Sequence, residues 1–407
     1  MPQLTHDDLL TACQSGGPSC LSSTTRLRPA GGEHVSVAPA KFVQRDQSVY
    51  AYEQRFLEGI LRHTVMIDSK QSQLNRLEAT VEQARVDGHA VLSRIPHVQV
   101  TYGEGAAAES FTDLVLPHRV FDAHIRAGTV DGTPTTQTPL YRAVRDAQPA
   151  DARALLDVSP LTLVLGGWDA SRRSRQGRWR SALVGEIIGF LQGVGPDGQG
   201  RPEPGRRGGA RVDPVGMQVN VDGATMRALA AGQRDELSPK LFDKVVKQAD
   251  RIKPNAPESA SALGFGGIPP GLDQLGGVAC QPIVRTHVLS FATLRQMRFG
   301  AGAAGDAGCR ALLAALALAG LARSDAELYL RANCDLVEDG LTTVALDQRG
   351  GKLLALEPLT IEAADALLAE ALAYAGHTAG VEWSGRVLTV VGNPAVVRGA
   401  EDEEVDQ

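Results

Sequence analysis

The residues of this sequence that are best suited to chemistry are arginines gathered in one short segment. The segment "GGWDASRRSRQGRWR" (166–180) begins near Trp168, ends near Trp179 and holds five arginines within nine positions. These are Arg172, Arg173, Arg175, Arg178 and Arg180, named the arginine cluster below. A guanidinium group is planar, stays charged and matches the paired oxygens of a phosphate. The cluster therefore predicts phosphate binding, with a solvated loop as the alternative.

Positive charge is concentrated around this cluster although the protein as a whole is acidic. The 407 residues carry a net charge of −6, whereas residues 172–211 contain nine arginines and three acidic side chains. A GC-rich genome would raise the arginine content, but it would not gather arginines in one segment. The placement favours a polyanion that is held by its phosphates whatever its base sequence.

The segments on either side of the cluster predict a strand and then a helix. "LTLVLGG" (161–167) has the length and apolar character of a buried strand, and Arg180–Leu191 has apolar residues at helical spacing. The cluster would then precede a helix N-terminus, where unpaired N–H groups and the helix dipole favour anions.

A second group of hydrogen-bond donors lies on another predicted helix. The pattern from Tyr50 to Arg85 has helical spacing, and within it "IDSKQSQLNRLE" (67–78) is strongly polar. The candidate contacts with phosphate or ribose are Lys70, Gln71, Gln73, Asn75 and Arg76. A solvated helix face is the alternative interpretation.

The rest of the chain predicts helices and strands that alternate between long loops. Helices are expected at 121–126, 140–146, 224–231, 239–250, 307–321 and 361–374. Strands are expected within 94–118, at 283–291 and 386–392, and as a pair at 328–337 and 341–348 around Gly340. Loops are expected at 14–25, 28–40, 193–214 (basic and mobile) and 263–277 (rich in Gly and Pro). We expect one domain over residues 1–400 and a disordered acidic tail at 401–407.

Several kinds of site are not predicted by this sequence. Aromatic residues make up 4% of the chain and no RNP-type motif occurs, which argues against a platform that stacks free bases. No metal-ligand spacing, Walker motif or nucleophile elbow is present, so no metal, cofactor or catalytic residue is expected. "GAGAAG" (300–305) matches the dinucleotide fingerprint, but the segment before it is amphipathic rather than a buried strand.

The cysteines and the hydropathy pattern favour a cytoplasmic protein. The five cysteines (Cys13, Cys20, Cys280, Cys309 and Cys334) are scattered and form no CxxC pair, which favours free thiols in a reducing compartment. We find no continuous apolar run of membrane-spanning length, so no contact with a membrane is expected.

Six blocks of sequence together resemble one known family. In order they are "IDSKQSQLNRLE" (67–78), "LPHRVFDAHIR" (116–126), "SPLTLVLGGWDASRRSRQGRWRSALVGEIIGF" (159–190), "GFGGIPP" (264–270), "VLSFATLRQMRF" (288–299) and "LRANCDLV" (330–337). The chain resembles, over roughly residues 26–390, the RAMP-type backbone subunit of the type I-U (also called I-G) CRISPR interference complex, or Cascade.

This resemblance implies an α+β fold in which an RRM-like (ferredoxin-like) palm carries large helical and loop insertions. It implies a non-catalytic subunit that binds the CRISPR guide RNA, polymerises along it with copies of itself and joins other Cascade subunits in antiviral defence. The guide, rather than the protein, would read the target DNA strand. His118 and Arg119 of the second block and Trp168 of the third join the arginine cluster and the polar helix as candidate RNA contacts.

Two other functions remain open on the sequence. One is a ribonuclease like the related type III backbone subunits, in which a loop aspartate, here Asp169, cuts target RNA. The other is an NAD-dependent oxidoreductase that binds its cofactor at residues 300–305.

Overall fold

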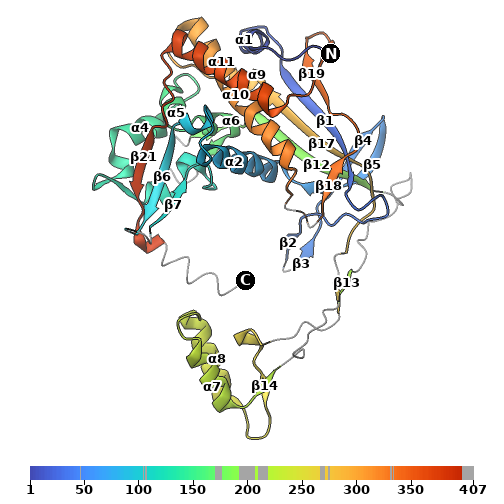
Figure 1. The fold of residues 1–407 in the computed structure, drawn as a ribbon, viewed down its shortest axis with the longest axis vertical. Coiled ribbons are helices and arrows are strands. Elements are labelled where there is room, and N and C mark those ends of the chain that lie inside the picture. The colour runs from blue at the N-terminus through green and yellow to red at the C-terminus, as the bar shows by residue number, and fades with distance from the viewer. Residues whose placement is uncertain are drawn as a thin grey trace. The chain divides into compact units, whose positions relative to one another are not determined.

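The computed structural model describes residues 1–45, 47–103, 105, 108–169, 177–191, 207–209, 219–265, 271–273, 276–330, 332 and 334–396. Arg172, Arg173 and Arg175 lie outside the described residues, as do most of 193–214, residues 266–270 and the tail 401–407. The chain divides into unit 1 (Met1–Glu203 and Gly277–Gly392) and unit 2 (Pro204–Gly276 and Asn393–Gln407). Unit 2 therefore interrupts unit 1 in the sequence (Figure 1).

An eight-stranded sheet forms the centre of unit 1. Its strands are β1 (Cys20–Pro29), β4 (Tyr52–Leu57), β5 (Ile60–Asp68), β12 (Leu183–Leu191), β17 (Cys280–Ser290), β18 (Leu336–Glu338), β19 (Thr343–Asp347) and β20 (Leu353–Leu356). The spatial order is β20-β19-β1-β17-β12-β5-β4, with β18 paired beside β19 on β1, and all these pairs are antiparallel. Burial alternates along β17, where Ile283, Arg285, His287 and Leu289 all face the interior.

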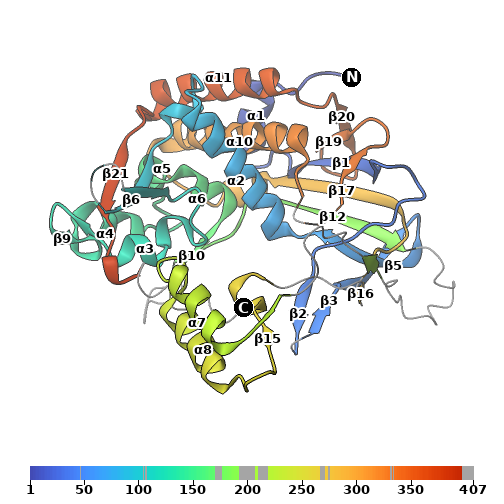
Figure 2. The same cartoon turned by 60° about the horizontal axis from the view of Figure 1, so that its bottom comes forward.

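Two long helices pack on that inward face. Helix α2 (Lys70–Val86) precedes β12, and α10 (Gly302–Glu327) lies between β17 and β19 in the sequence. Both helices lie over the sheet, and α11 (Ile361–Ala379) lies outside α10 (Figure 2). A Cβ atom at Gly320 of α10 would lie 2.7 Å from Leu77 Cδ2 of α2, so the two helices approach closely where this glycine stands. The α+β prediction is confirmed.

Helix α10 is long and apolar enough to cross a membrane by length and composition alone. However, 78% of its most apolar stretch is buried inside the structure. Since a core helix of a soluble protein meets the same criterion, α10 is the central helix of unit 1.

A buried chain of polar side chains, the polar core network, ties α2 and α10 to the sheet. Gln73 of α2 donates from Nε2 to Asp68 of β5 (2.5 Å), and its Oε1 lies 3.1 Å from His287 Nε2 of β17. Because an amide oxygen only accepts, the His287 proton sits on Nε2. Burial lowers the pKa of His287 to about 3, so its ring is neutral at pH 7. Arg285 Nη1 lies 3.3 Å from Asp325 Oδ1 of α10, and His287 Nδ1 lies 3.9 Å from the same oxygen.

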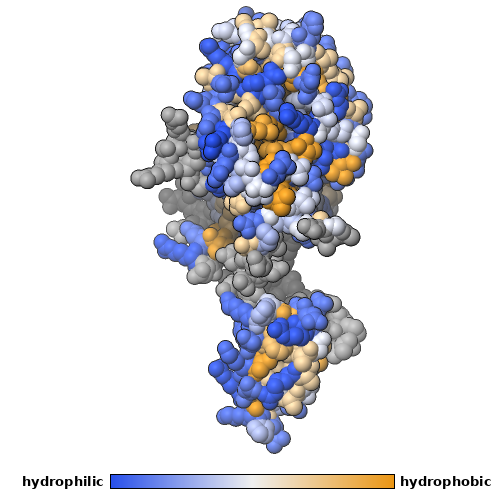
Figure 3. All heavy atoms as spheres, turned by 90° about the vertical axis from the view of Figure 1, so that its left-hand side faces the viewer, coloured by the Kyte–Doolittle hydropathy of each residue, from blue (hydrophilic) through white to orange (hydrophobic). Residues whose placement is uncertain are grey.

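A second sheet lies in another part of unit 1. Its order is β7 (Glu109–Thr112), β6 (His97–Tyr102), β21 (Val387–Val391), β8 (Thr129–Val130) and β9 (Thr133–Pro134), and β21 pairs with β6 in parallel. Figure 3 shows apolar residues gathered on the face of unit 1 that carries these strands. Exposed large apolar residues of this region are Phe111, Val115, Val387 and Val391.

Short helices link this second sheet to the candidate site. They are α3 (Ala123–Arg126), α4 (Pro139–Asp146), α5 (Arg153–Val158) and α6 (Pro160–Leu165). The backbone N–H of Val98 and the Oγ of Ser159, which lies between α5 and α6, donate to Asp113 at 2.9 and 2.5 Å. Asp113 is fully buried, and burial raises its pKa to about 7, against the effect of these two hydrogen bonds.

The remaining elements of unit 1 are short, and unit 2 has a core of its own. In unit 1 they are α1 (His6–Cys13), β2 (Phe42–Gln44), β3 (Gln47–Val49) and α9 (Phe291–Leu294). Unit 2 contains β13 (Arg207–Gly209), β14 (Asn220–Val221), α7 (Gly223–Gly232), α8 (Pro239–Arg251), β15 (Glu258–Ser259) and β16 (Gly271–Asp273). Helices α7 and α8 pack around Met226, Ala230 and Val245.

The structure corrects the predicted elements around the arginine cluster. Residues 160–165 form helix α6 rather than a strand, and 183–191 form strand β12 rather than a helix. Leu183, Ile187 and Leu191 are spaced by four, which places them on one face of a helix and equally of a strand. The cluster therefore follows a helix and precedes a strand, so the argument from a helix N-terminus is wrong.

Three other predictions are also corrected. Residues 52–68, expected within one long helix, form the hairpin β4–β5, and the helix begins at Lys70. The expected loop at 14–25 contains most of β1, because alternating Leu21, Thr25 and Leu27 face the core among serines and threonines. Strands β18 and β19 both pair with β1 instead of with each other.

The other predicted helices and strands are confirmed to within a few residues. They are α3, α4, α7, α8, α10, α11, β6, β17 and β21.

Asp113 predicts a pH dependence of stability. The folded protein holds its proton up to about pH 7, whereas an unfolded chain releases it near pH 4. The folded state binds more protons in that window, so the free energy of unfolding should fall as pH rises, by up to about 1.4 kcal/mol per unit. Urea unfolding at pH 4.5 and 7.5 should show a smaller fall for Asp113→Asn. Equal falls in both proteins would contradict this role.

Candidate nucleic-acid interface

Arg178 of the arginine cluster sits on a short two-stranded hairpin, and two glycines fix the way into it. Strand β10 (Gly167–Trp168) pairs with β11 (Arg178–Trp179) directly after α6. Gly166 has φ +86°, and a Cβ atom there would lie 2.8 Å from the carbonyl oxygen of Trp179. A Cβ atom at Gly167 would lie 3.0 Å from the ring of Phe121. Only glycine therefore lets the chain leave α6 and enter the hairpin at this place.

The hairpin presents an aromatic ring and guanidinium groups at the surface. Trp168 is 48% exposed, and the Arg178 guanidinium carbon lies 5.4 Å from the centroid of its ring. Arg180 is exposed as well. Trp179, by contrast, is buried. Arg178 and Arg180 are thus available to an anion, and the cation over the Trp168 ring makes a surface on which a planar group can lie.

Asp169, the candidate catalytic aspartate, faces inward. Its side chain is 1% exposed, and its Oδ1 lies 3.7 Å from Arg126 Nη1. Its backbone N–H donates to the Gly177 carbonyl across the hairpin. Asp169 therefore connects the hairpin to Arg126 of α3 through its buried side chain.

Helix α2 exposes part of its predicted donor set. Ser69 caps the helix by accepting from the Ser72 N–H at 3.2 Å. Lys70, Gln71 and Asn75 are exposed. Arg76 is half-buried, with its guanidinium carbon 4.6 Å from the centroid of the Tyr329 ring.

Gln73, by contrast, belongs to the interior of the fold. Both ends of its amide are already bonded in the polar core network. The structure therefore separates Gln73 from the other four candidates on α2. The available local signal is spacing, because Gln73 lies four and eight residues before the buried Leu77 and Val81 and so shares their helix face.

One arginine joins this helix to the hairpin. Arg119 pairs with Glu78 of α2 and donates from Nη1 to the carbonyl oxygen of Gly166 at 2.9 Å. Burial raises the pKa of Glu78, and the Arg119 charge opposes that rise. One side chain therefore joins the buried Glu78 of α2 to the residue that directly precedes the β10–β11 hairpin. His118 next to it is exposed.

Two arginines on the far face of the large sheet are not among the candidates from the sequence. Arg26 and Arg28 of β1 are exposed and alternate with the buried Leu27. The alternation of Arg26, Leu27 and Arg28 indicates a strand with one exposed face. The sequence, however, predicts a loop for the residues just before it (14–25).

Among the described residues no cluster of three His, Cys, Asp or Glu side chains could hold a metal ion. All five cysteines are free. "GAGAAG" leads into α10 from the short helix α9 rather than from a strand, so it lacks the structural context of a dinucleotide site.

Comparison with known proteins agrees with a CRISPR-associated family. Residues 21–192 match the family model described as CRISPR-associated protein GSU0053. The matched span is less than half of the chain and includes α2, Arg119 and the β10–β11 hairpin. No curated protein gives a match.

The Arg119–Glu78 pair predicts a large effect of one substitution. Arg119→Met would leave the buried Glu78 carboxylate without its partner and should cost about 3 kcal/mol or more of folding free energy. The double variant Arg119→Met/Glu78→Leu removes both charges and should recover most of that stability. Urea unfolding measures both variants. A single variant as stable as the parent would show that the pair does not hold the hairpin to α2.

Proposed function

We propose, on the premise that residues 21–192 indicate a CRISPR-associated family, that this chain is a non-catalytic guide-RNA-binding backbone subunit of a type I Cascade complex, subtype I-U/I-G. Several copies would lie along one guide RNA in the cytoplasm and present it to target DNA in antiviral defence. The family match by itself indicates a CRISPR-associated role and participation in a CRISPR complex.

The observation that carries this proposal is the Arg119 bridge between Glu78 of α2 and the carbonyl oxygen of Gly166, directly before the β10–β11 hairpin. Arg178 and Arg180 on the hairpin and Lys70 on the helix offer charge to phosphates, and Gln71 and Asn75 offer donors to phosphate or ribose. Arg119 holds the two elements together. Such a surface follows a backbone and reads no base edges.

The strand order supports a ferredoxin-like palm. The chain runs β1, α2, β12, β17, α10, β19, and the corresponding strands lie in the order β19-β1-β17-β12. A β-α-β-β-α-β unit with both helices on one face has this arrangement. The hairpin β4–β5 and the residues between β12 and β17 are then insertions into it.

The outer face of the large sheet supports binding without base stacking. Its central residues on β1 and β17 are Ser22, Thr24, Thr286 and Val288, none of them aromatic. An RRM that stacks bases carries aromatic residues at such positions. Sequence reading is therefore assigned to the guide, which pairs with the target strand.

The inward position of Asp169 favours a scaffold over a ribonuclease. A carboxylate that is 1% exposed and paired with Arg126 cannot approach an RNA phosphate without leaving the hairpin. Purified chain incubated with Mg²⁺ and target RNA should leave the RNA intact. Cleavage that disappears in Asp169→Ala would establish the ribonuclease instead.

The basic hairpin predicts a specific change in RNA binding. The double variant Arg178→Ala/Arg180→Ala should weaken guide binding by a similar factor for unrelated guide sequences. The salt dependence, as the slope of log K against log salt concentration, should become shallower by about 0.7 for each phosphate that the variant no longer binds. Filter binding at four salt concentrations measures both quantities.

A matched control removes the same charge elsewhere. Arg142 of α4 and Lys352 in the β19–β20 turn are exposed, so Arg142→Ala/Lys352→Ala changes net charge equally. The control should keep the parental slope, and thermal stability should hardly change in either variant, since exposed charges contribute little to folding. Equal slopes in all three proteins would refute the assignment of the hairpin to RNA.

A further inference from the structure

An exposed aromatic ring stands beside the donor face of α2. Tyr329 comes directly after Leu328, the C-cap of α10, which has φ +42°. The ring is 70% exposed, and the Arg76 guanidinium carbon lies 4.6 Å from its centroid. Arg76 thus covers one part of the ring, and most of the rest is open to solvent. A planar group can lie on a ring that is held in this way.

A cavity opens next to this pair, between α2 and the end of α10. Its volume is about 450 Å³, within the range of ligand pockets, and Arg76, Thr80 and Tyr329 are part of its wall. The cavity borders an exposed stripe of α2 at four-residue spacing, namely Gln71, Asn75, Ala79 and Gln83, and the last two also line it. A strand that is held by Gln71 and Asn75 therefore reaches the cavity.

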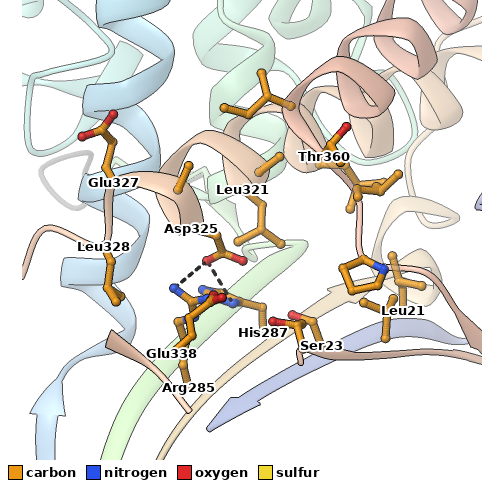
Figure 4. Close-up of a pocket in the computed structure, with 18 of the residues that line it drawn as sticks. Leu21, Ser23, Arg285, His287, Leu321, Asp325, Glu327, Leu328, Glu338 and Thr360 are labelled. Atoms are coloured by element: carbon orange, nitrogen blue, oxygen red, sulfur yellow. Dashed lines mark hydrogen bonds and ion pairs between the residues drawn. The ribbon is translucent and has the colours of Figure 1, made fainter. Parts of the chain in front are cut away.

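The polar core network fixes the end of α10 from which the ring projects. Arg285 of β17 lies 3.3 Å from Asp325, and Figure 4 shows this contact together with Leu328 at the end of the helix. Arg323 of α10 donates from Nη1 and Nη2 to Asp365 of α11 at 2.7 and 2.8 Å. Because both contacts hold the last turns of α10, a ligand that stacks on the ring does not have to order it first.

A larger cavity of unit 1, of about 740 Å³, does not suit a nucleotide. At its polar floor Arg285 faces Asp325 and also lies 2.9 Å from Glu338 (Figure 4). Glu327 adds a third carboxylate to the lining. One guanidinium among three carboxylates leaves an excess of negative charge, which repels phosphate. The smaller cavity beside Tyr329 is therefore the better candidate.

Arg76 retains its capacity to donate hydrogen bonds. It forms no hydrogen bond or ion pair with any residue that the structure describes, and its Nε is buried without a partner. The N–H groups of a guanidinium lie in its own plane, so stacking on a ring leaves them available to phosphate oxygens. The lining of the cavity as a whole is neutral, because its two arginines are balanced by Glu327 and Asp87. An uncharged base fits such a cavity, while the phosphate of a nucleotide fits the free donors of Arg76.

We propose that Tyr329 stacks on one base of the bound RNA strand while Arg76 donates to a phosphate of the same strand. The inference rests on the proposed function and adds a base contact to the backbone contacts of α2. Every base has a π face, so the site accepts any guide sequence. It lies on the helix side of the large sheet, where stacking needs no aromatic residue on the outer face.

The test compares two ligands that differ only in their bases. One is a short single-stranded RNA of mixed sequence, and the other is a chain of stable abasic ribose nucleotides with the same number of phosphates. The full chain should bind the RNA more tightly, and Tyr329→Leu should lower the ratio of the two affinities about tenfold, the contribution of one stacked base. Tyr329→Trp should keep the ratio. Fluorescence anisotropy of end-labelled ligands measures both affinities.

Salt dependence separates the two side chains. Tyr329→Leu removes no phosphate contact, so the slope of log K against log salt concentration should stay parental. Arg76→Met keeps an apolar chain beside the ring, removes the charge and should make the slope shallower by about 0.7. The control is Phe56→Leu, which removes a ring that is 72% exposed on β4 and should change neither the ratio nor the slope. Thermal melting checks that each variant is folded.

The possible outcomes distinguish this inference from the proposed function. If Tyr329→Leu weakens the binding of both ligands equally, or of neither, the ring does not contact a base, and the proposed function still stands on the RNA binding of the parent. A parent that binds no single-stranded RNA would count against both. Repeating the comparison with DNA of the same sequence identifies the strand: a ratio that falls for DNA alone would assign the ring to the target and overturn the proposal.

Discussion

The arrangement of unit 1 depends on polar side chains that are buried between the sheet and its helices. His287 and Arg285 stand on the inward face of β17, where apolar residues would be the simpler choice, and each needs a partner from a helix. A buried charge or amide without a partner costs more free energy than imperfect apolar packing, so only one placement of α2 and of α10 satisfies all of them. The network thus fixes the register of both helices, and Gly185 of β12 leaves the space that the His287 ring occupies.

The candidate interface inherits its geometry from that register. Once α2 is fixed, Glu78 is fixed, and Arg119, which pairs with Glu78, also donates to the carbonyl oxygen of Gly166. The hairpin that carries Trp168 and Arg178 is therefore positioned by contacts in the interior rather than by its own few backbone hydrogen bonds. The two short strands that carry Trp168 and Arg178 therefore keep a defined position although both of these side chains are exposed.

The α+β class and many individual helices and strands can be predicted from the sequence, and the failures share a physical cause. Apolar residues spaced by four, such as Leu183, Ile187 and Leu191, suit a helix and a strand alike, so local periodicity cannot decide β12. The β4–β5 hairpin escapes prediction for the same reason. For the site, the arginines and the polar face of α2 are visible as residue types, and the spacing of Gln73 with Leu77 and Val81 indicates its buried face. The bond of Gln73 to His287 and the bridging role of Arg119 depend on partners more than 40 residues away, which no local pattern reveals.

Strand β12 ends where β17 begins, with Leu191 paired directly to Cys280. The residues between them, which include all of the described helices of unit 2, connect two adjacent strand ends that a tight turn could also connect. The central sheet therefore treats this long segment as a connection whose length is immaterial to its own pairing. Such a junction tolerates replacement of the inserted segment. Evolution or a protein engineer can place segments of different size and charge there while the sheet, its two helices and the polar core network stay unchanged.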